Sequence, residues 1–151
     1  MLRGGFEHQV DDKGRIIIPV RFREFLSPAC FITRGLHNCL FVFPWTVWVE
    51  IEKNLNATSI IDENALALQR FFGTGIEASL DGQGRLILPA TLREYAGIQK
   101  DIFVLGAISH LELWAKSRWT EYENKELSTA GILEKAKNLG VKLQVSPGEI
   151  A

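Results

Sequence analysis

Hydrophobic residues recur along this chain in two short patterns, one typical of strands and one typical of helices. Residues 16–18 are three consecutive aliphatics, which predict a short strand, and Pro19 ends it because proline cannot donate to a strand ladder. The same proline suits the first position of a helix. Phe22, Phe25 and Leu26 then follow at the i, i+3, i+4 spacing of one helical face. The pattern therefore predicts a short strand followed directly by a proline-started helix.

The chain contains this pattern twice, seventy residues apart. Residues 11–24 and 81–94 both carry an Asp, a Gly three residues later, an Arg, three aliphatics, a Pro and a final Arg-Glu. With one residue inserted, the similarity continues at an offset of seventy-one. The further matches are 31–35 with 102–106, 40–43 with 111–114, and Trp48 with Trp119. Agreement over this length indicates an internal duplication.

Turn residues and periodicity predict the remaining elements. An Asp and a Gly bracket the polar segments 11–14 and 81–84, which is typical of a hairpin turn in which Gly takes a positive φ. Asp62 is the expected N-cap of a connector helix that continues to Gly73. The other expected elements are strands at 6–10, 31–34 and 40–43, a helix at 45–56, a second repeat starting at Ile76, and helices at about 117–127 and 131–139.

These elements favour an α+β fold organised in four parts. The expected parts are a first repeat at 1–56, a helical connector at 57–75, a second repeat at 76–127, and a C-terminal helix and tail at 128–151. A single repeat is so small that its core is marginal, so we expect the two repeats to pack together or to assemble further. The tail at 141–151 has no pattern that decides between a strand, an interface arm and a frayed end.

Composition indicates a folded, soluble intracellular protein. Hydrophobic residues make up 46% of the chain, with four Trp and nine Phe, which excludes a disordered chain. The longest apolar stretch, 40–49, is about half of the ~20 residues that a membrane-spanning helix needs. The N-terminus lacks the apolar run of a signal peptide. Cys30 and Cys39 are interpreted as reduced, partly buried thiols of a cytosolic protein.

Charge adds only a weak indication of an anionic partner. The formal net charge is −1, which does not by itself indicate a nucleic-acid-binding protein. Residues 1–36 hold six Lys or Arg against four acidic residues, and the rest of the chain is neutral or acidic. This local excess fits an anion-facing surface and an ordinary solvated face about equally well.

The repeated Asp-x-x-x-Arg pair has two interpretations that the residues alone leave open. In the first, Asp caps the turn and pairs with Arg only to hold the hairpin, as a weak surface ion pair. In the second, Asp orients the Arg, which then makes bidentate contacts to a phosphate or to the edge of a guanine. The occurrence of the pair at the same place in both repeats is compatible with either interpretation.

Metal-binding and catalytic motifs receive little support. An EF-hand loop starting at Asp11 or Asp81 fails, because its ligand positions hold residues such as Arg15 and Arg85. His37 and Cys39 form at most half of a zinc site, with no second pair of ligands. The sequence contains no nucleophile elbow, P-loop or dinucleotide-binding motif. We therefore expect neither an enzyme nor a bound metal or other cofactor.

The four tryptophans are a candidate for base stacking, but core packing explains them better. Trp45 and Trp48 are spaced for a helix, and Trp114 and Trp119 have aliphatic neighbours or repeat counterparts. Glu112 lies close to Trp114 and is a candidate partner where the two repeats meet.

The doubled motif, Gly14-Arg15 with Pro19 and Gly84-Arg85 with Pro89, resembles the MraZ family of bacterial transcriptional regulators, within the AbrB/SpoVT-like superfamily. The resemblance covers about residues 1–125. Its further supporting residues are Arg3-Gly4, 39–44 with Trp48, 69–73, 92–97 and 112–114.

The resemblance implies a fold of two tandem swapped-hairpin, AbrB/SpoVT-like β-barrel repeats with flanking helices, related by a pseudo-twofold axis. It also implies a ring-shaped homo-oligomer, in the cytoplasm and associated with the nucleoid. The ring would bind double-stranded DNA at repeated promoter elements of the division and cell-wall gene cluster, with no membrane and no small-molecule substrate as partners. The implied DNA-binding residues are Arg3, Lys13, Gly14, Arg15, Gln83, Gly84 and Arg85, with Asp11 and Asp81 orienting the turns.

Two other classes of protein stay open on the sequence. One is an assembly or interaction protein in which the turns contact neighbouring subunits and DNA binding is weak or absent. The other is an antitoxin-like AbrB relative that binds a toxin, for which the tail offers a place but no positive signal. Salt dependence separates the first from a DNA-binding protein, because phosphate contacts weaken with salt and apolar assembly does not.

Overall fold

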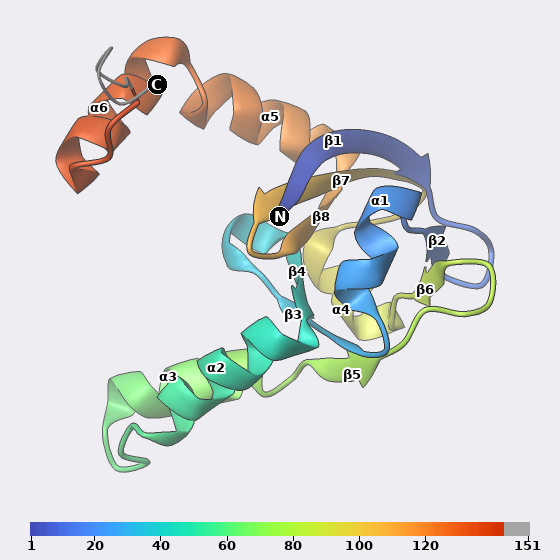
Figure 1. Cartoon of the computed structure of the whole chain (residues 1–151), viewed down its shortest axis with the longest axis horizontal. Helices are drawn as coiled ribbons and strands as arrows, with labels where there is room; N and C mark the ends of the chain where they lie inside the picture. The colour runs from blue at the N-terminus through green and yellow to red at the C-terminus, as the bar shows by residue number, and fades with distance from the viewer. Residues whose placement is uncertain (144–151) are drawn as a thin grey trace, which may run out of the picture. The chain divides into compact units, whose positions relative to one another are not determined.

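The main sheet takes its strands from both repeats (Figure 1). The computed structural model describes residues 1–143. Six strands are joined in the order β1-β7-β8-β4-β3-β5, antiparallel throughout. The strands are β1 (Leu2–Gln9), β3 (Cys30–Arg34), β4 (Leu40–Pro44), β5 (Ile76–Ala78), β7 (Asp101–Ile108) and β8 (Leu111–Ala115).

Each repeat supplies its first strand to the other repeat. β1 pairs with β7 along its whole length, from Leu2 opposite Ile108 to Gln9 opposite Asp101. In the same way, β5 of the second repeat pairs with β3 of the first. β4 and β8 pair at the centre of the sheet, with Phe41 opposite Glu112. The strand order is therefore the same when the two repeats are exchanged.

A second, two-stranded sheet is formed by β2 (Arg15–Ile17) and β6 (Arg85–Ile87). Its register is symmetric, because Ile16 faces Leu86 at the centre and each Arg faces an Ile of the other strand. Side chains alternate between the two faces of a strand. Ile16 and Leu86 accordingly point into the core, whereas Ile17 and Ile87 are exposed.

The core between these sheets is shared by the repeats. One cluster of buried residues contains side chains from both, so burial of either repeat's apolar surface requires the other. Its equivalent pairs are Ile16 and Leu86, Ile18 and Leu88, Phe22 and Leu92, Leu26 and Ala96, Leu40 and Leu111, and Val42 and Leu113.

The described residues form six α-helices: α1 (Val20–Arg23), α2 (Trp45–Asn56), α3 (Glu63–Phe72), α4 (Ala90–Ala96), α5 (Lys116–Glu126) and α6 (Thr129–Leu139). The carboxylate of Asp62 accepts hydrogen bonds from the backbone N–H groups of Asn64 and Ala65 at 2.8 and 3.1 Å, which confirms it as the N-cap of α3. Residues 1–116 form one compact unit, and the described chain from Ser117 onward forms a second.

The described part of the second unit, residues 117–143, contains α5 from Ser117 onward and α6. The hydroxyl of Ser128 accepts a hydrogen bond from the backbone N–H of Gly131 at 3.2 Å and caps α6. Gly140 ends this helix in the left-handed conformation, with φ 69°. The expected end of α6 at Gly140 is confirmed; residues 144–151 of the tail lie outside the described residues.

The repeat alignment is correct in the central strands but wrong by one residue in β3. Ile32 pairs with Val42 and Val104 pairs with Leu113. Because Val42 is equivalent to Leu113, Ile32 is equivalent to Val104, an offset of seventy-two instead of seventy-one. The second repeat has two additional residues before β7, where α4 continues to a left-handed Gly97. It has one residue fewer than the first repeat in the hairpin between β7 and β8.

Three further expectations differ in detail. β1 begins at Leu2 instead of residue 6, because β7 is long enough to pair with all of it. Pro19 and Pro89 have extended ψ angles of 137° and 144° and occupy the N-cap, one residue before the first helical position. The first repeat's helix is only four residues long and continues as a 3₁₀ turn (Glu24–Leu26), because Pro28 follows shortly afterwards.

Three of the four tryptophans, Trp48, Trp114 and Trp119, pack in the interior. Trp48 stacks on Phe31 with ring centroids 3.8 Å apart, in a cluster with Phe43 beneath α2. Trp114 is also buried, and its indole N–H donates to Glu112 at 3.0 Å. Trp45 is the most exposed of the four tryptophans. Core packing is therefore the correct interpretation for Trp48 and Trp114, and Glu112 is confirmed as a partner of Trp114.

Both cysteines are fully buried, not partly buried as expected. Burial raises the pKa of the Cys30 thiol to about 12, and burial likewise raises the pKa of the Cys39 thiol. Across residues 1–143, no helix combines the length and apolarity required to traverse a lipid bilayer.

The inner and outer faces of β6 give a direct test of this register. Leu86 is 0% exposed and the adjacent Ile87 is 60% exposed. We expect Leu86→Ala to lower the free energy of unfolding by about 3 kcal/mol through a core cavity, and Ile87→Ala to change it by less than about 1 kcal/mol. Urea unfolding of the two variants measures both. Equal destabilisation would mean that Ile87 also lies in the core.

Candidate nucleic-acid interface

The turn that precedes β2 is held by one aspartate. The Asp11 Oδ1 atom accepts hydrogen bonds from the backbone N–H groups of Lys13 and Arg15, both at 2.9 Å. Asp11 Oδ2 accepts from Arg15 Nε at 2.7 Å. The backbone N–H of Gly14 donates to the Asp11 carbonyl at 3.0 Å, and Gly14 has φ 75°. Asp11 therefore fixes both the turn and the direction of the Arg15 side chain.

The turn that precedes β6 repeats this geometry. Asp81 Oδ1 accepts from the backbone N–H groups of Gln83 and Arg85 at 2.9 Å, and Oδ2 accepts from Arg85 Nε at 2.7 Å. Gly84 has φ 74°. Because three donors converge on each carboxylate, Asp11 and Asp81 are part of the fold of the turn as well as partners of the arginines.

These hydrogen bonds favour the charged form of each carboxylate. The backbone N–H of Arg15 is the main cause that lowers the pKa of Asp11 from 3.8 to about 2, and the Arg15 side chain adds to it. The pKa of Asp81 is lowered in the same way, mainly by the backbone N–H of Arg85. Both turns therefore keep their charged carboxylates throughout the neutral and mildly acidic range.

Each turn is also joined to the opposite repeat. The backbone N–H of Ile18 donates to the carbonyl of Gly84 at 2.9 Å, and the N–H of Leu88 donates to the carbonyl of Gly14 at 2.8 Å. The loops leading into β2 and β6 lie at the edge of the 1–116 unit (Figure 1). The short β2–β6 ribbon thus fixes the distance between the two turns.

The outward face of this ribbon carries the two motif arginines. Arg15 is opposite Ile87 and Arg85 is opposite Ile17, so all four side chains share one face. Each arginine side chain is 25% exposed, and its Nε is taken by its aspartate. No hydrogen bond to the terminal Nη groups of either arginine is found within residues 1–143.

Two further arginines belong to this region and were missed from the sequence. Arg23 donates through Nε to the carbonyl of Ile18 at 2.9 Å, and Arg93 donates to the carbonyl of Leu88 at 3.0 Å. The guanidinium of Arg23 lies against Gly84, and that of Arg93 lies against Gly14. The sequence contained a sign of them, because both copies of the motif, 11–24 and 81–94, end in Arg-Glu. Only the fold shows that each arginine lies beside the turn of the other repeat.

Arg3 lies apart from the other expected site residues. It is at the opposite end of β1 from the Asp11 turn, and it lines a cleft with Met1, Arg21 and Phe22. The structure therefore brings Arg15 and Arg85 to one face, with Lys13 on the adjoining turn, but does not bring Arg3 there.

The two turns carry different charged residues but the same formal net charge. Lys13 of the first corresponds to Gln83 of the second, and Arg21 corresponds to Thr91. Asp12 corresponds to Gly82. The two halves of the site therefore have the same backbone geometry, whereas Lys13 has no cationic counterpart in the second turn and Arg21 lies in the cleft with Arg3.

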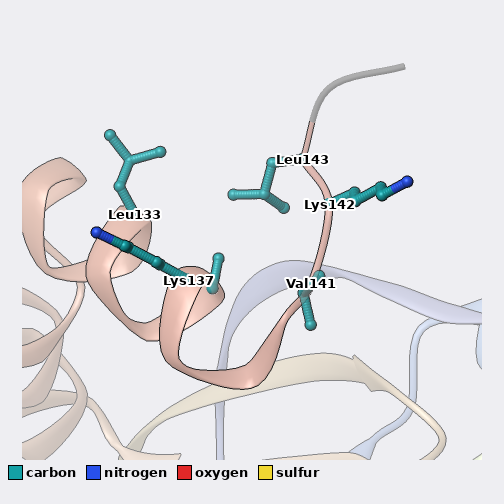
Figure 2. Close-up of a pocket in the computed structure, with 6 residues that line it drawn as sticks. Leu133, Lys137, Val141, Lys142 and Leu143 are labelled. Atoms are coloured by element: carbon teal, nitrogen blue, oxygen red, sulfur yellow. The ribbon is translucent and has the colours of Figure 1, made fainter. Parts of the chain in front are cut away.

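Neither a metal-binding group nor the cleft of the second unit provides a competing polar site within residues 1–143. None of the residues 1–143 form a group of three or more His, Cys, Asp or Glu side chains arranged to hold a metal ion. A cleft in the second unit is mainly apolar, with Leu133 and Leu143 on facing sides of it (Figure 2). This cleft has no cluster of polar groups suited to catalysis.

Sequence comparison provides the assignment of the family. The family model of the MraZ protein, described as antitoxin-like, matches residues 1–71 and again residues 71–139. The chain belongs to the MraZ family. The two MraZ matches correspond to the two repeats, each with one Asp-x-x-x-Arg turn.

Curated relatives carry the name Transcriptional regulator MraZ. The protein from Moorella thermoacetica is 48% identical over 123 residues, covering 81% of this chain and 86% of its own length. That from Acetivibrio thermocellus is 41% identical over 143 residues, covering 93% of this chain and all of its own length. The MraZ relative from Clostridium tetani is 39% identical over 142 residues.

Two glycines of the second turn provide a matched test of its geometry. A Cβ on Gly84 would meet the guanidinium of Arg23 and would require a left-handed conformation, whereas a Cβ on Gly82 meets nothing within 4 Å. We expect Gly84→Ala to cost about 1–2 kcal/mol of unfolding free energy and Gly82→Ala less than about 0.5 kcal/mol. Thermal unfolding measures both, and a tolerant Gly84→Ala would contradict the proposed tight turn.

The charged state of Asp11 gives a pH-dependent prediction. Its folded pKa of about 2 is below the ordinary 3.8, so its contribution to stability is fully present above pH ~4 and is lost as the pH falls through about 2. An NMR titration of the Asp11 carboxyl carbon is expected to give a midpoint near 2. Arg15→Ala should raise this midpoint only part of the way to 3.8, because the backbone donors remain. A wild-type midpoint near 3.8 would contradict the hydrogen-bonded turn.

Proposed function

We propose that this protein is a sequence-specific DNA-binding transcriptional regulator and not an enzyme. The observation that carries the proposal is the β2–β6 ribbon, whose outer face presents Arg15 and Arg85, each directed by its own aspartate. The names of the curated relatives support the same function.

The ribbon has dimensions and chemistry suited to duplex DNA. The major groove of B-DNA is about 12 Å wide and admits a two-stranded β-ribbon. In Arg15 and Arg85 the aspartate takes Nε, so the two Nη groups can donate together to a phosphate or to O6 and N7 of a guanine. A side chain that is already fixed in its binding conformation loses less conformational entropy when it binds.

Arg23 and Arg93 extend this cationic surface. Each lies against the glycine of the opposite turn, so each turn combines an arginine from both repeats. We propose Lys13, Gly14, Arg15, Gly84 and Arg85 as the DNA-contacting set, with Asp11 and Asp81 orienting the turns. Arg3 would contact DNA only outside this ribbon, because it lies at the other end of β1.

We propose that the first repeat makes most of the phosphate contacts. Lys13 has the uncharged counterpart Gln83, and Arg21, which lines the cleft with Arg3 outside the ribbon, has the uncharged counterpart Thr91. The second turn would then serve mainly to fix the geometry of the first, through the hydrogen bonds between the two strands.

Resemblance to the family also suggests a more detailed architecture, oligomeric state and DNA target. We propose two swapped-hairpin β-barrel repeats at 1–56 and 76–127, with a connector at 57–75 and a C-terminal part at 128–151; the exchange of β1 and β5 between the repeats supports it. We further propose a ring-shaped homo-oligomer in the cytoplasm and on the nucleoid. It would bind repeated promoter elements of the division and cell-wall gene cluster. A ring that presents several turns to repeated elements gains avidity, which compensates for a net charge of −1.

The test is a DNA-binding titration with the promoter region upstream of this protein's own gene. Wild type, Arg15→Ala and Arg85→Ala are compared at 50 and 200 mM salt, with Arg70→Ala as a control that removes an exposed arginine from α3. We expect Arg15→Ala to lower affinity at least about tenfold, Arg85→Ala to lower it less, and Arg70→Ala to leave it unchanged. Affinity should fall with log salt at a slope of about −0.9 per phosphate contacted.

Size-exclusion chromatography of each variant shows whether assembly is intact. If wild type assembled but bound no DNA, the assembly-protein alternative would replace this proposal. Equal losses for Arg15→Ala and Arg85→Ala would instead overturn only the unequal roles of the two repeats.

A further inference from the structure

The ribbon exposes one aliphatic side chain beside each motif arginine. Ile17 is 50% exposed and Ile87 is 60% exposed. They occupy the same position in the two repeats, and neither is needed for the core, which Ile16 and Leu86 fill from the opposite face. Burial therefore does not explain why both positions are isoleucine.

The four outward-facing side chains alternate between arginine and isoleucine, both along each strand and across the ribbon. Arg15 and Arg85 lie on one diagonal, and Ile17 and Ile87 lie on the other, because each arginine is paired across the ribbon with an isoleucine. Within each strand the arginine and the isoleucine are two residues apart and point to the same side. Each motif arginine therefore has an exposed isoleucine directly opposite it on the same face of the ribbon.

We infer that Ile17 and Ile87 read thymine methyl groups in the major groove; the inference rests on the proposed DNA-binding function. Thymine is the base that presents a methyl group at C5, and apolar side chains recognise it by contact. A polar residue at these positions would keep its water and give no preference for that methyl group. Each strand thus pairs a reader of guanine or phosphate with a reader of thymine.

The test replaces thymine by uracil in the promoter DNA. Uracil keeps the base pairing of thymine and lacks only the C5 methyl group. Wild type is expected to bind the uracil duplex more weakly, by about fourfold for each methyl group that an isoleucine contacts. The double variant Ile17→Ser, Ile87→Ser is expected to bind the thymine and uracil duplexes equally.

A matched control removes an isoleucine elsewhere. Ile61 is 90% exposed in the loop before α3, and Ile61→Ser should retain the wild-type preference for thymine. Because all three isoleucines are exposed, the variants are expected to unfold at the wild-type temperature, which thermal unfolding checks.

The outcomes separate this inference from the proposed function. If wild type binds the thymine and uracil duplexes equally, the thymine inference is wrong while DNA binding stands. If the double variant keeps the thymine preference, other residues read the methyl groups and the inference is also wrong. If assembled wild type binds neither duplex, the proposed function itself fails.

Discussion

The exchange of strands between the repeats is the constraint on which the rest of this structure depends. Without a neighbour on its outer side, β3 or β7 would leave a row of unpaired backbone N–H and C=O groups. In this chain the other repeat supplies that outer neighbour, β5 on β3 and β1 on β7, and it also supplies half of the core side chains. Each repeat therefore lacks both a complete sheet and a complete core without its partner.

The same constraint determines the geometry of the candidate interface. Since β2 pairs with β6 alone within residues 1–143, the two turns are held at a fixed separation by a ribbon that neither repeat can form by itself. Arg23 and Arg93 extend this dependence to the side chains, because each lies on a glycine of the opposite turn. An Ala at Gly14 would therefore disturb Arg93, 79 residues later in the chain, and an Ala at Gly84 would disturb Arg23, 61 residues earlier.

Much of this arrangement was predictable from local chemistry. The aliphatic triplets, the prolines and the Asp–Gly brackets correctly indicated β2, β6 and their turns, because those features depend on a few neighbouring residues. The one-residue error at β3 arose because Ile32 and Phe31 are both apolar, so hydrophobicity alone did not fix the register against Val104. The role of Arg23 was not predictable, since it depends on the proximity of two segments that are distant in the chain.

Arg3 shows that residues near each other in the sequence can also lie apart in the fold. It is close to the doubled motif in sequence, yet β1 carries it away from the turn. The DNA-contacting role that the resemblance implies for Arg3 stays a prediction, and the extended geometry of an eight-residue strand separates Arg3 from the Asp11 turn. Proximity along a strand is thus a poor guide to which charged residues share a surface.

The difference between Lys13 and Gln83 has a consequence for how such a surface can change. In a dimer of two identical chains, every substitution occurs twice, and its cost to folding is counted twice. Here the two symmetric halves are encoded separately, so a lysine can be present in one turn and absent from the other. A single chain can therefore keep the backbone of a twofold-symmetric pair while giving its two ends different chemical preferences.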